Sequence, residues 1–145
     1  GAYRQAVESY AEIQKEMREN ARFMFEYGHA LHKLHETELS NKVLKEALKV
    51  SGDPMILNII GKNEQEMKHY ESAEYWFMRA VHRLPGRIYP YYLLANLYAD
   101  PSFYRRDKLE RMVQTVLEKE PKIQSTAIKQ MRRKARELLK KVPEN

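Results

Sequence analysis

Hydrophobic residues recur at intervals of three and four along nearly the whole chain, and no run alternates apolar and polar residues as a surface strand does. Because this spacing puts apolar side chains on one face of a helix, the sequence predicts an all-α protein. Asp53 before Pro54, and Ser125, are expected to cap helices, while Pro85 and Pro121 are expected to end them. The predicted helices span about 2–19, 21–36, 38–50, 54–68, 70–84, 88–99, 103–119 and 125–141.

The chain also repeats itself with a period of 33 residues. Small residues recur where the two helices of a hairpin approach closely, and large residues recur where the next hairpin packs. A third, imperfect copy places Ala95 34 residues after Gly61 and Pro121 36 residues after Pro85, and the two extra residues fit a loop within 99–104. The pairs that lie 33 residues apart are Gly28 and Gly61, Ser40 and Ala73, Leu44 and Phe77, and Ala47 and Ala80.

A series of small and aromatic residues within 54–85 resembles the tetratricopeptide repeat (TPR) family. Its members are Gly61, Ala73, Phe77, Ala80 and Pro85, with mutual spacings of 12, 4, 3 and 5. The chain departs from the family pattern at Leu57, where Trp is favoured, at Glu64, where Tyr is favoured, and near Leu109, where a small residue is favoured.

This resemblance implies an all-α solenoid of about three TPR-like hairpins plus a C-terminal capping helix. The whole of 1–145 would form one domain. Its parts would be 2–19 as a truncated leading repeat helix, 21–52 and 54–86 as two repeats, 88–121 as a degenerate third repeat, and 125–141 as the capping helix.

A second resemblance covers most of the chain. The run Arg87-Ile-Tyr-Pro-Tyr-Tyr-Leu-Leu94 is similar to the repeat-bearing C-terminal tails of bacterial O-antigen ligase or polymerase-like membrane proteins. Further segments that carry this resemblance are 20–23, 53–54, 60–63, 84–86, 97–98 and 125–128. It implies a parent membrane glycosyltransferase that handles polyprenyl-linked glycans, with this chain as its soluble appendage.

Composition narrows the possible chemistry. The length of 145 residues, with 43% hydrophobic and 32% charged residues, suits one ordinary domain. The absence of cysteine excludes a disulfide framework, a thiolate metal site and a cysteine nucleophile. The sequence shows neither a long apolar span nor a signal peptide, and Gly1 in place of an initiator Met suggests a fragment boundary or a tag remnant.

The chain has no recognisable catalytic motif. A nucleophile elbow, a phosphate-binding glycine loop and a zincin motif are missing, and the acidic residues are expected on polar helix faces among Lys and Arg. His29, His32 and His35 could suggest a metal site, but residues 29 and 35 are separated by about 600° of helical turn, so the three side chains do not converge. We therefore expect no catalytic residue, no metal and no cofactor in this chain.

Aromatic residues make up 10% of the chain, and Trp76, Phe77, Tyr91 and Tyr98 fall at core spacing. In the TPR fold the first helix of each repeat lines the concave face, so the resemblance assigns a set of groove positions. This set mixes polar, basic and aromatic groups, which suits an extended peptide or a glycan better than an amphipathic helix; a merely solvated groove is the alternative. The groove positions are Arg22, Phe25, His29, His32, Lys33, Asn58, Lys62, Gln65, Glu66, Tyr92 and Asn96.

The last predicted helix has one apolar and one basic side. Its apolar stripe is Ile128, Met131, Ala135, Leu138 and Val142, and its basic side is Lys129, Arg132, Arg133, Arg136 and Lys140, with Arg105, Arg106, Lys108 and Arg111 adding charge from the preceding helix. Residues 1–99 carry 13 basic and 13 acidic residues and residues 100–145 carry 13 and 7, so the whole net charge of +6 lies in the last third. The basic side is expected to bind an anionic surface, such as lipid headgroups or diphosphate-linked glycans, or to be a solvated face. Nucleic acid is disfavoured, because the charge is modest and no recognition motif occurs.

These patterns predict a non-catalytic interaction module that forms the soluble tail of an O-antigen ligase or polymerase-like membrane protein. It would bind a protein, peptide or glycan in its groove. It would be membrane-associated through an upstream region and lie on the periplasmic or the cytoplasmic side. The alternatives are a free-standing TPR adaptor for an extended peptide, and a domain that binds anionic lipid or another polyanion through its C-terminal helix.

Overall fold

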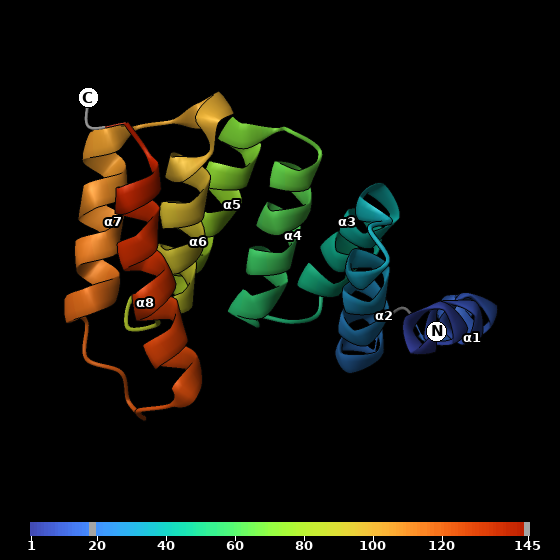
Figure 1. Cartoon of the computed structure of the whole chain (residues 1–145). Helices are drawn as coiled ribbons and strands as arrows, with labels where there is room; N and C mark the ends of the chain where they lie inside the picture. The colour runs from blue at the N-terminus through green and yellow to red at the C-terminus, as the bar shows by residue number, and fades with distance from the viewer. Residues whose placement is uncertain (18–19, 144–145) are drawn as a thin grey trace. The chain divides into compact units, whose positions relative to one another are not determined.

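A computed structural model describes residues 1–17 and 20–143, and within these ranges all regular structure is helical, as predicted (Figure 1). The last two residues of the predicted helix 2–19 lie outside the described residues. The elements are α1 (Ala2–Met17), α2 (Ala21–Lys33), α3 (Thr37–Leu48), α4 (Pro54–Glu66), α5 (Tyr70–Arg83), α6 (Tyr89–Ala99), the 3₁₀ helix η1 (Pro101–Phe103), α7 (Arg106–Glu118) and α8 (Thr126–Lys141).

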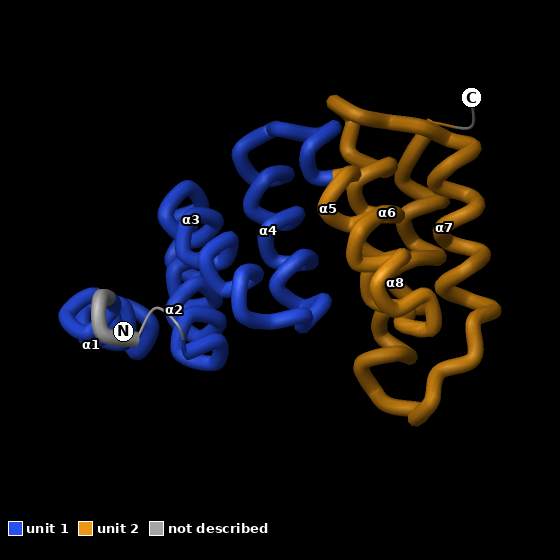
Figure 2. Tube along the Cα trace, turned by 180° about the vertical axis from the view of Figure 1, so that it is seen from behind, with its two compact units in different colours: residues 1–73 blue, residues 74–145 orange. Residues whose placement is uncertain are grey.

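The chain divides into two compact units, residues 1–73 and 74–145, and the boundary falls inside α5 (Figure 2). In unit 1, α1 packs on α2, α2 on α3 and α3 on α4, and α2 also contacts α4. In unit 2, α6 packs on both α7 and α8, and α7 packs on α8. Short connections therefore join neighbours that lie side by side, as expected for consecutive helical hairpins.

The positions that recur every 33 residues are buried. Ser40 and Ala73, Leu44 and Phe77, and Ala47 and Ala80 are each 0% exposed. Gly28 is required by the close approach of α2 and α3, because a Cβ atom at this position would lie 2.4 Å from Leu44 Cδ2. The small residues of the repeat thus set the spacing of the hairpin, and the large ones fill its core.

The predicted caps are present. The side chain of Asp53 accepts a hydrogen bond from the backbone N–H of Met55 (2.9 Å), with Pro54 in the first turn of α4. Ser125 accepts from the N–H of Ile128 (3.3 Å) at the start of α8. These side chains satisfy backbone donors that the helix leaves unpaired, which is why both signals were readable in the sequence.

Several predicted helices ran too far. α2 ends at Lys33 and α4 at Glu66, because His35 (φ 61°) and Lys68 (φ 67°) adopt left-handed backbone conformations. The N–H of Glu36 then donates to the carbonyl of Leu31 (2.9 Å), closing the α2 end. The two left-handed residues are 33 apart and neither is glycine, so no sequence signal marked these stops.

The loop expected within 99–104 is confirmed, but it contains the short helix η1, and α7 starts at Arg106 rather than near 103. Asp100 accepts from the N–H of Ser102 (2.9 Å) and starts this turn. Phe103 is 7% exposed and stacks on Tyr98 with ring centroids 6.3 Å apart. The extra residues of the third repeat therefore form a packed turn.

Candidate partner-binding site

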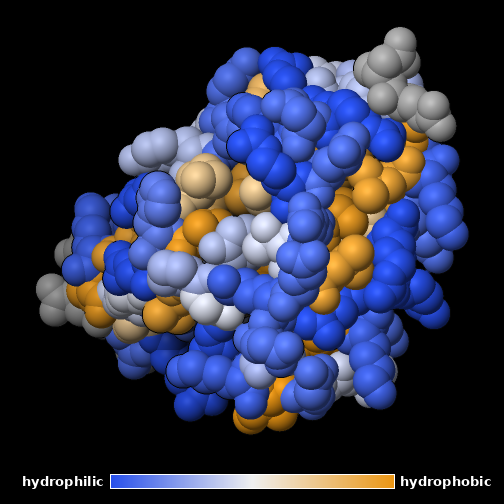
Figure 3. All heavy atoms as spheres, turned by 90° about the vertical axis from the view of Figure 1, so that its left-hand side faces the viewer, coloured by the Kyte–Doolittle hydropathy of each residue, from blue (hydrophilic) through white to orange (hydrophobic). Residues whose placement is uncertain are grey.

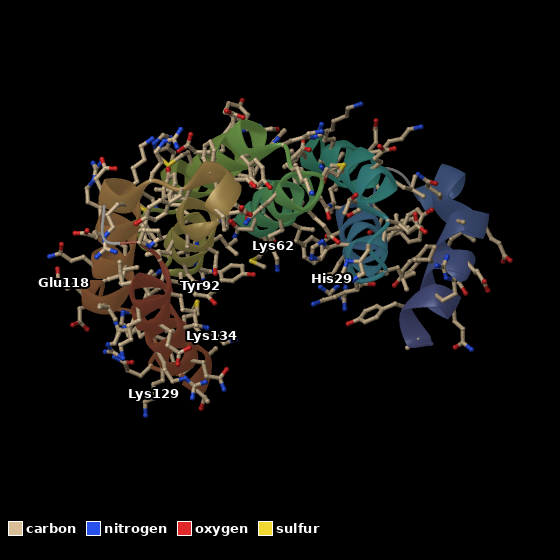
Figure 4. All side chains as sticks on the ribbon, turned by 45° about the horizontal axis from the view of Figure 1, so that its top comes forward. His29, Lys62, Tyr92, Glu118, Lys129 and Lys134 are labelled. Carbon is tan, nitrogen blue, oxygen red and sulfur yellow. The ribbon has the colours of Figure 1, made fainter. Side chains whose placement is uncertain are left out.

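A cluster of basic and imidazole side chains lies on α2 and α4 of unit 1. His29 and Lys33 are one helical turn apart on α2, and Lys62 is on α4, close enough that both lysines lower the pKa of His29. Burial is the larger cause of this lowering, because it disfavours the charged imidazolium. Figure 4 shows His29 and Lys62 leaving their ribbons on the same side. Lys33, Lys62 and the acidic Glu66 also lie close enough to His32 to act on its pKa. We call His29, His32, Lys33, Lys62 and Glu66 the α2/α4 cluster.

Under this cluster lies a buried hydrogen-bond network centred on Asn63, which is 0% exposed. The side-chain amide of Asn63 donates to Ser40 Oγ (2.9 Å) and to Asn41 Oδ1 (2.8 Å). Ser40 in turn donates to the carbonyl of Gly28 (2.7 Å). The network joins α2, α3 and α4, and it satisfies polar atoms that burial would otherwise leave unpaired.

The same network fixes the protonation pattern of His32. Both amide hydrogens of Asn63 are already donated, so its Oδ1 is an acceptor and His32 Nδ1, 2.7 Å away, must be the donor. Burial is the main cause that lowers the pKa of His32, and it outweighs the hydrogen bond to Asn63, which raises that pKa; Lys62 acts in the same direction as burial. A neutral His32 with its proton on Nδ1 presents Nε2 as a hydrogen-bond acceptor.

Aromatic rings border the cluster. Phe25 stacks on His29 with ring centroids 6.2 Å apart and an interplanar angle of 4°. Tyr3 of α1 meets His29 edge-on at 6.3 Å. His35 is bonded through Nδ1 to Glu66 Oε1, away from His29. The three histidines therefore have different partners, and within 1–17 and 20–143 no group of three His or acidic residues could hold a metal ion.

The other predicted groove positions differ in the exposure of their side chains and in their hydrogen-bond partners. Arg22 is exposed and pairs with Glu26 on its own helix (3.0 Å). Asn58 is 3% exposed, and its Oδ1 has no hydrogen-bond partner among the described residues. Gln65 is half-buried on α4.

Tyr92 and Asn96 belong to unit 2, where both side chains are half-buried on α6. Asn96 Nδ2 donates to the carbonyl of Tyr92 (3.1 Å) in its own helix. Unit 1 alone therefore brings together the five residues of the α2/α4 cluster.

The expectation that the acidic residues lie on polar helix faces is wrong at Glu64. This residue is 9% exposed and accepts hydrogen bonds from His69 Nδ1 and from Ser72 Oγ, each 3.0 Å away. Both donors come from the turn after α4 and the first turn of α5. Only the folded turn brings them to Glu64, so the sequence pattern could not predict a buried carboxylate there.

The predicted core aromatics divide into two groups. Phe77 (0% exposed) and Tyr98 (4% exposed) are buried, as expected. Trp76 and Tyr91 are only half-buried. The guanidinium of Arg79 covers the Trp76 ring at 4.8 Å from its centroid, and Tyr91 Oη donates to the carbonyl of Pro85 (3.2 Å), so a polar contact occupies each exposed edge.

On α8 the apolar stripe packs as predicted, with Ala135 fully buried and the other four members half-buried. Arg132 differs from the other predicted anion-binding residues. Its Nε donates to the carbonyl of Val116 (3.1 Å) and its Nη2 to the carbonyl of Lys119 (2.7 Å), so it caps the end of α7. The remaining four, Lys129, Arg133, Arg136 and Lys140, are exposed on one side of α8. We call these four residues the basic stripe.

The basic residues around α7 are largely paired. Arg106 bonds to Glu110 (2.6 Å), Lys108 to Glu74 (3.5 Å) and Arg111 to Asp107 (3.3 Å). Arg105 lies over the ring of Phe103, 5.1 Å from its centroid. Arg106, Lys108 and Arg111 therefore each have an acidic partner, and the addition of these residues to the anion-binding face stays a prediction.

These features define an all-helical protein built from TPR-like helical hairpins with a C-terminal capping helix, the fold class expected from the repeat. Two solved structures of MamA, a TPR-containing protein, are similar to the chain at 17% sequence identity. One has a TM-score of 0.73 and covers 95% of this chain and 85% of its own. The other has a TM-score of 0.72, with 97% and 80% covered. No protein-family model and no curated protein matches the chain.

Proposed function

We propose that the chain is a non-catalytic protein-interaction module that binds an extended peptide along α2 and α4 of unit 1. The observation that carries this proposal is the α2/α4 cluster, which sets donors, acceptors and rings next to one another on two helices that contact. An extended peptide has free backbone N–H and C=O groups along its whole length. His32 Nε2 can accept from such an N–H, and Lys33 and Lys62 can donate to carbonyl or carboxylate oxygens.

The composition of the site argues against a helical ligand. An amphipathic helix binds through a continuous apolar groove, whereas this surface alternates imidazole, ammonium and carboxylate groups. Phe25 and Tyr3 add ring surface beside His29, which suits single side chains of a ligand. The hydrogen-bond network centred on Asn63 holds the His32 side chain in one orientation, so less conformational entropy is lost on binding.

Selection from a random peptide library displayed on phage tests this proposal. Peptides selected on the wild-type chain should bind the variants His29→Ala and Lys62→Ala at least about tenfold more weakly, the loss expected when one charged or anchoring contact is removed. Lys42→Ala, at an exposed position of α3, is the matched control and should bind normally. Selected peptides that bind all four proteins equally would contradict the site.

A finer hypothesis places this module in a larger protein. The similarity of 87–94 and the accompanying segments to the tails of O-antigen ligase or polymerase-like proteins supports a soluble appendage that positions a partner or glycan near a membrane enzyme. Within 1–17 and 20–143 no helix combines the length and the apolar character needed to cross a bilayer.

An immunoblot of fractionated source cells tests this hypothesis. A membrane-embedded band much larger than 17.3 kDa would support the appendage, and protease accessibility of that band would assign the periplasmic or the cytoplasmic side. A band near 17.3 kDa in the soluble fraction would contradict it and favour the free-standing adaptor.

A further inference from the structure

The outer side of α8 carries a continuous line of exposed cations. The basic stripe follows the spacing 4, 3 and 4 along the helix, which keeps Lys129, Arg133, Arg136 and Lys140 on one side. No acidic side chain pairs with them in the described hydrogen bonds and ion pairs, and Glu137 is the single acidic residue of α8. Figure 4 shows Lys129 near the start of the helix. The face formed by α7 and α8 is mostly hydrophilic (Figure 3).

This line of charge is held in a fixed position. Ala135 is 0% exposed against the helices beneath, and Arg132 ties α8 to the carbonyls at the end of α7. The carbonyl of Pro143 accepts from Arg106 Nη1 (3.0 Å) and from Tyr104 Oη, which secures the other end. The cations are therefore presented by a folded helix, and binding does not have to order the backbone first.

An exposed apolar side chain lies next to the start of this helix. Ile123, in the connection between α7 and α8, is 78% exposed, the highest value among the large hydrophobic residues whose exposure the structure describes. The residues from Lys122 to Ala127 around it are all exposed. In Figure 1 this connection projects beyond the ends of α7 and α8 within unit 2. Nothing in the packing of unit 2 accounts for an isoleucine in this exposed connection.

We propose that unit 2 binds the surface of anionic lipid bilayers, with Ile123 inserted below the headgroups and the basic stripe lying at headgroup level. A bilayer offers both phases that this surface needs, an anionic layer and an apolar layer directly beneath it. A nucleic acid offers phosphates but no apolar layer for Ile123. An acidic peptide would also leave Ile123 in water. This inference does not depend on the peptide site, since the two surfaces lie on different helices.

Flotation of the full chain with vesicles tests the electrostatic part. The wild-type protein should float with phosphatidylcholine vesicles that contain about 30% phosphatidylglycerol and not with pure phosphatidylcholine vesicles, and raising the salt should release it. The double variant Lys129→Glu and Arg133→Glu should partition at least about tenfold less. The double variant Lys42→Glu and Arg87→Glu changes the net charge equally at exposed positions outside α8 and should still float.

Fluorescence tests the insertion of residue 123. The chain has no cysteine, so Ile123→Cys creates a single site for an environment-sensitive fluorophore. Its emission should shift to the blue with the anionic vesicles, whereas the same label at Val50→Cys, which starts at 45% exposure, should not shift. Lys62→Ala should float normally, which separates this surface from the peptide site.

Three results would overturn the proposal. The first is equal loss of flotation in both charge-reversal doubles, provided that circular dichroism shows both to be folded. The second is flotation of the labelled chain without a blue shift at residue 123. The third is binding of the wild-type chain to duplex DNA but not to the anionic vesicles, which would make the basic stripe a nucleic-acid surface.

Discussion

At the scale of single residues, the side chain of Asn63 on α4 connects three helices of unit 1 by hydrogen bonds. It is fully buried and bonds at once to His32, Ser40 and Asn41, which lie on two other helices. A buried amide with all its hydrogen bonds satisfied stabilises modestly, but its removal leaves several partners unpaired. The same residue orients His32, so it links the packing of unit 1 to the proposed binding surface.

Asn63→Ala should therefore lower the free energy of unfolding by about 2–3 kcal/mol, because His32 Nδ1 and Asn41 Oδ1 lose their partner in a buried place. Urea denaturation followed by circular dichroism measures this loss. Asn96→Ala is the control, since its amide bonds only to a carbonyl of its own helix at a half-buried position, and a change below about 1 kcal/mol is expected. Equal losses would show that the network is not special.

The histidines of the cluster predict a dependence of stability on pH. Burial, with Lys33 and Lys62, lowers the pKa of His29. Burial also lowers the pKa of His32, and together with Lys62 and Lys33 it outweighs the hydrogen bond to Asn63 and the charge of Glu66, which raise that pKa. Below about pH 6.5 the unfolded chain then binds more protons than the folded chain, so stability falls as the pH falls, and this effect vanishes above about pH 7.5.

Denaturation at pH 7.5 and pH 5.5, roughly one unit either side of the ordinary histidine pKa, tests this sign. The variant His29→Gln should lose less stability between the two values than the wild type, because it lacks one of the two groups concerned. His82→Gln, which removes an exposed imidazole from α5, is the control and should follow the wild type. A wild-type chain that gains stability on acidification relative to His29→Gln would contradict the lowered pKa.

At the scale of elements, the end of α7 is completed by a side chain from α8. The last carbonyls of a helix lack intrahelical donors, and Arg132 supplies two N–H groups to those of Val116 and Lys119. Arg132 thus belongs to the packing of unit 2, although its sequence neighbours belong to the basic stripe.

Separate replacement of Arg132 and Arg133 distinguishes the capping role of the first from the exposed position of the second in the basic stripe. Arg132→Gln should lower the free energy of unfolding by about 1–2 kcal/mol, since two charge-assisted bonds to carbonyls are lost. Arg133→Gln, an exposed member of the basic stripe, should stay within about 0.5 kcal/mol of the wild type. Thermal or urea denaturation of the two variants gives the comparison, and a larger effect at Arg133 would reverse the assignment.

At the scale of the whole molecule, each of the two compact units carries one of the two proposed binding surfaces. Unit 1 is residues 1–73 and holds the α2/α4 cluster, while unit 2 is residues 74–145 and holds the basic stripe. The whole net charge of +6 lies in the last third of the sequence, after α6. The terminal helix α8 has a double role in unit 2, since it covers apolar surface of α6 and α7 and presents charge on its other side.

A chain that ends at Gln124 tests the covering role. Loss of α8 uncovers the apolar faces of α6 and α7, so the shortened chain should bind several-fold more of the dye ANS and should associate, as seen by light scattering. The double variant Lys129→Glu and Arg133→Glu keeps the apolar stripe and should bind the dye as the wild type does. Equal dye binding by all three chains would show that α8 covers no apolar surface.

The helices, the 33-residue repeat, the caps at Asp53 and Ser125 and the apolar stripe of α8 could all be predicted from the sequence. All of these depend on residues close together in the chain or on spacing along one helix, and such signals survive without any tertiary contact. The early ends of α2 and α4 could not be predicted from the sequence. His35 and Lys68 adopt left-handed conformations there, and neither is a glycine that would signal one.

The roles of particular polar residues, in contrast, follow from tertiary contacts. Glu64 is buried because the α4–α5 turn brings His69 and Ser72 to its carboxylate. Arg132 caps α7 because packing brings the carbonyls of Val116 and Lys119 within hydrogen-bond distance of its guanidinium. Asn63 joins helices because packing brings the side chains of Ser40 and Asn41 to its amide. The spacing of polar residues along the chain does not identify their distant hydrogen-bond partners. The role of a buried polar side chain therefore depends on which unpaired group the fold places beside it.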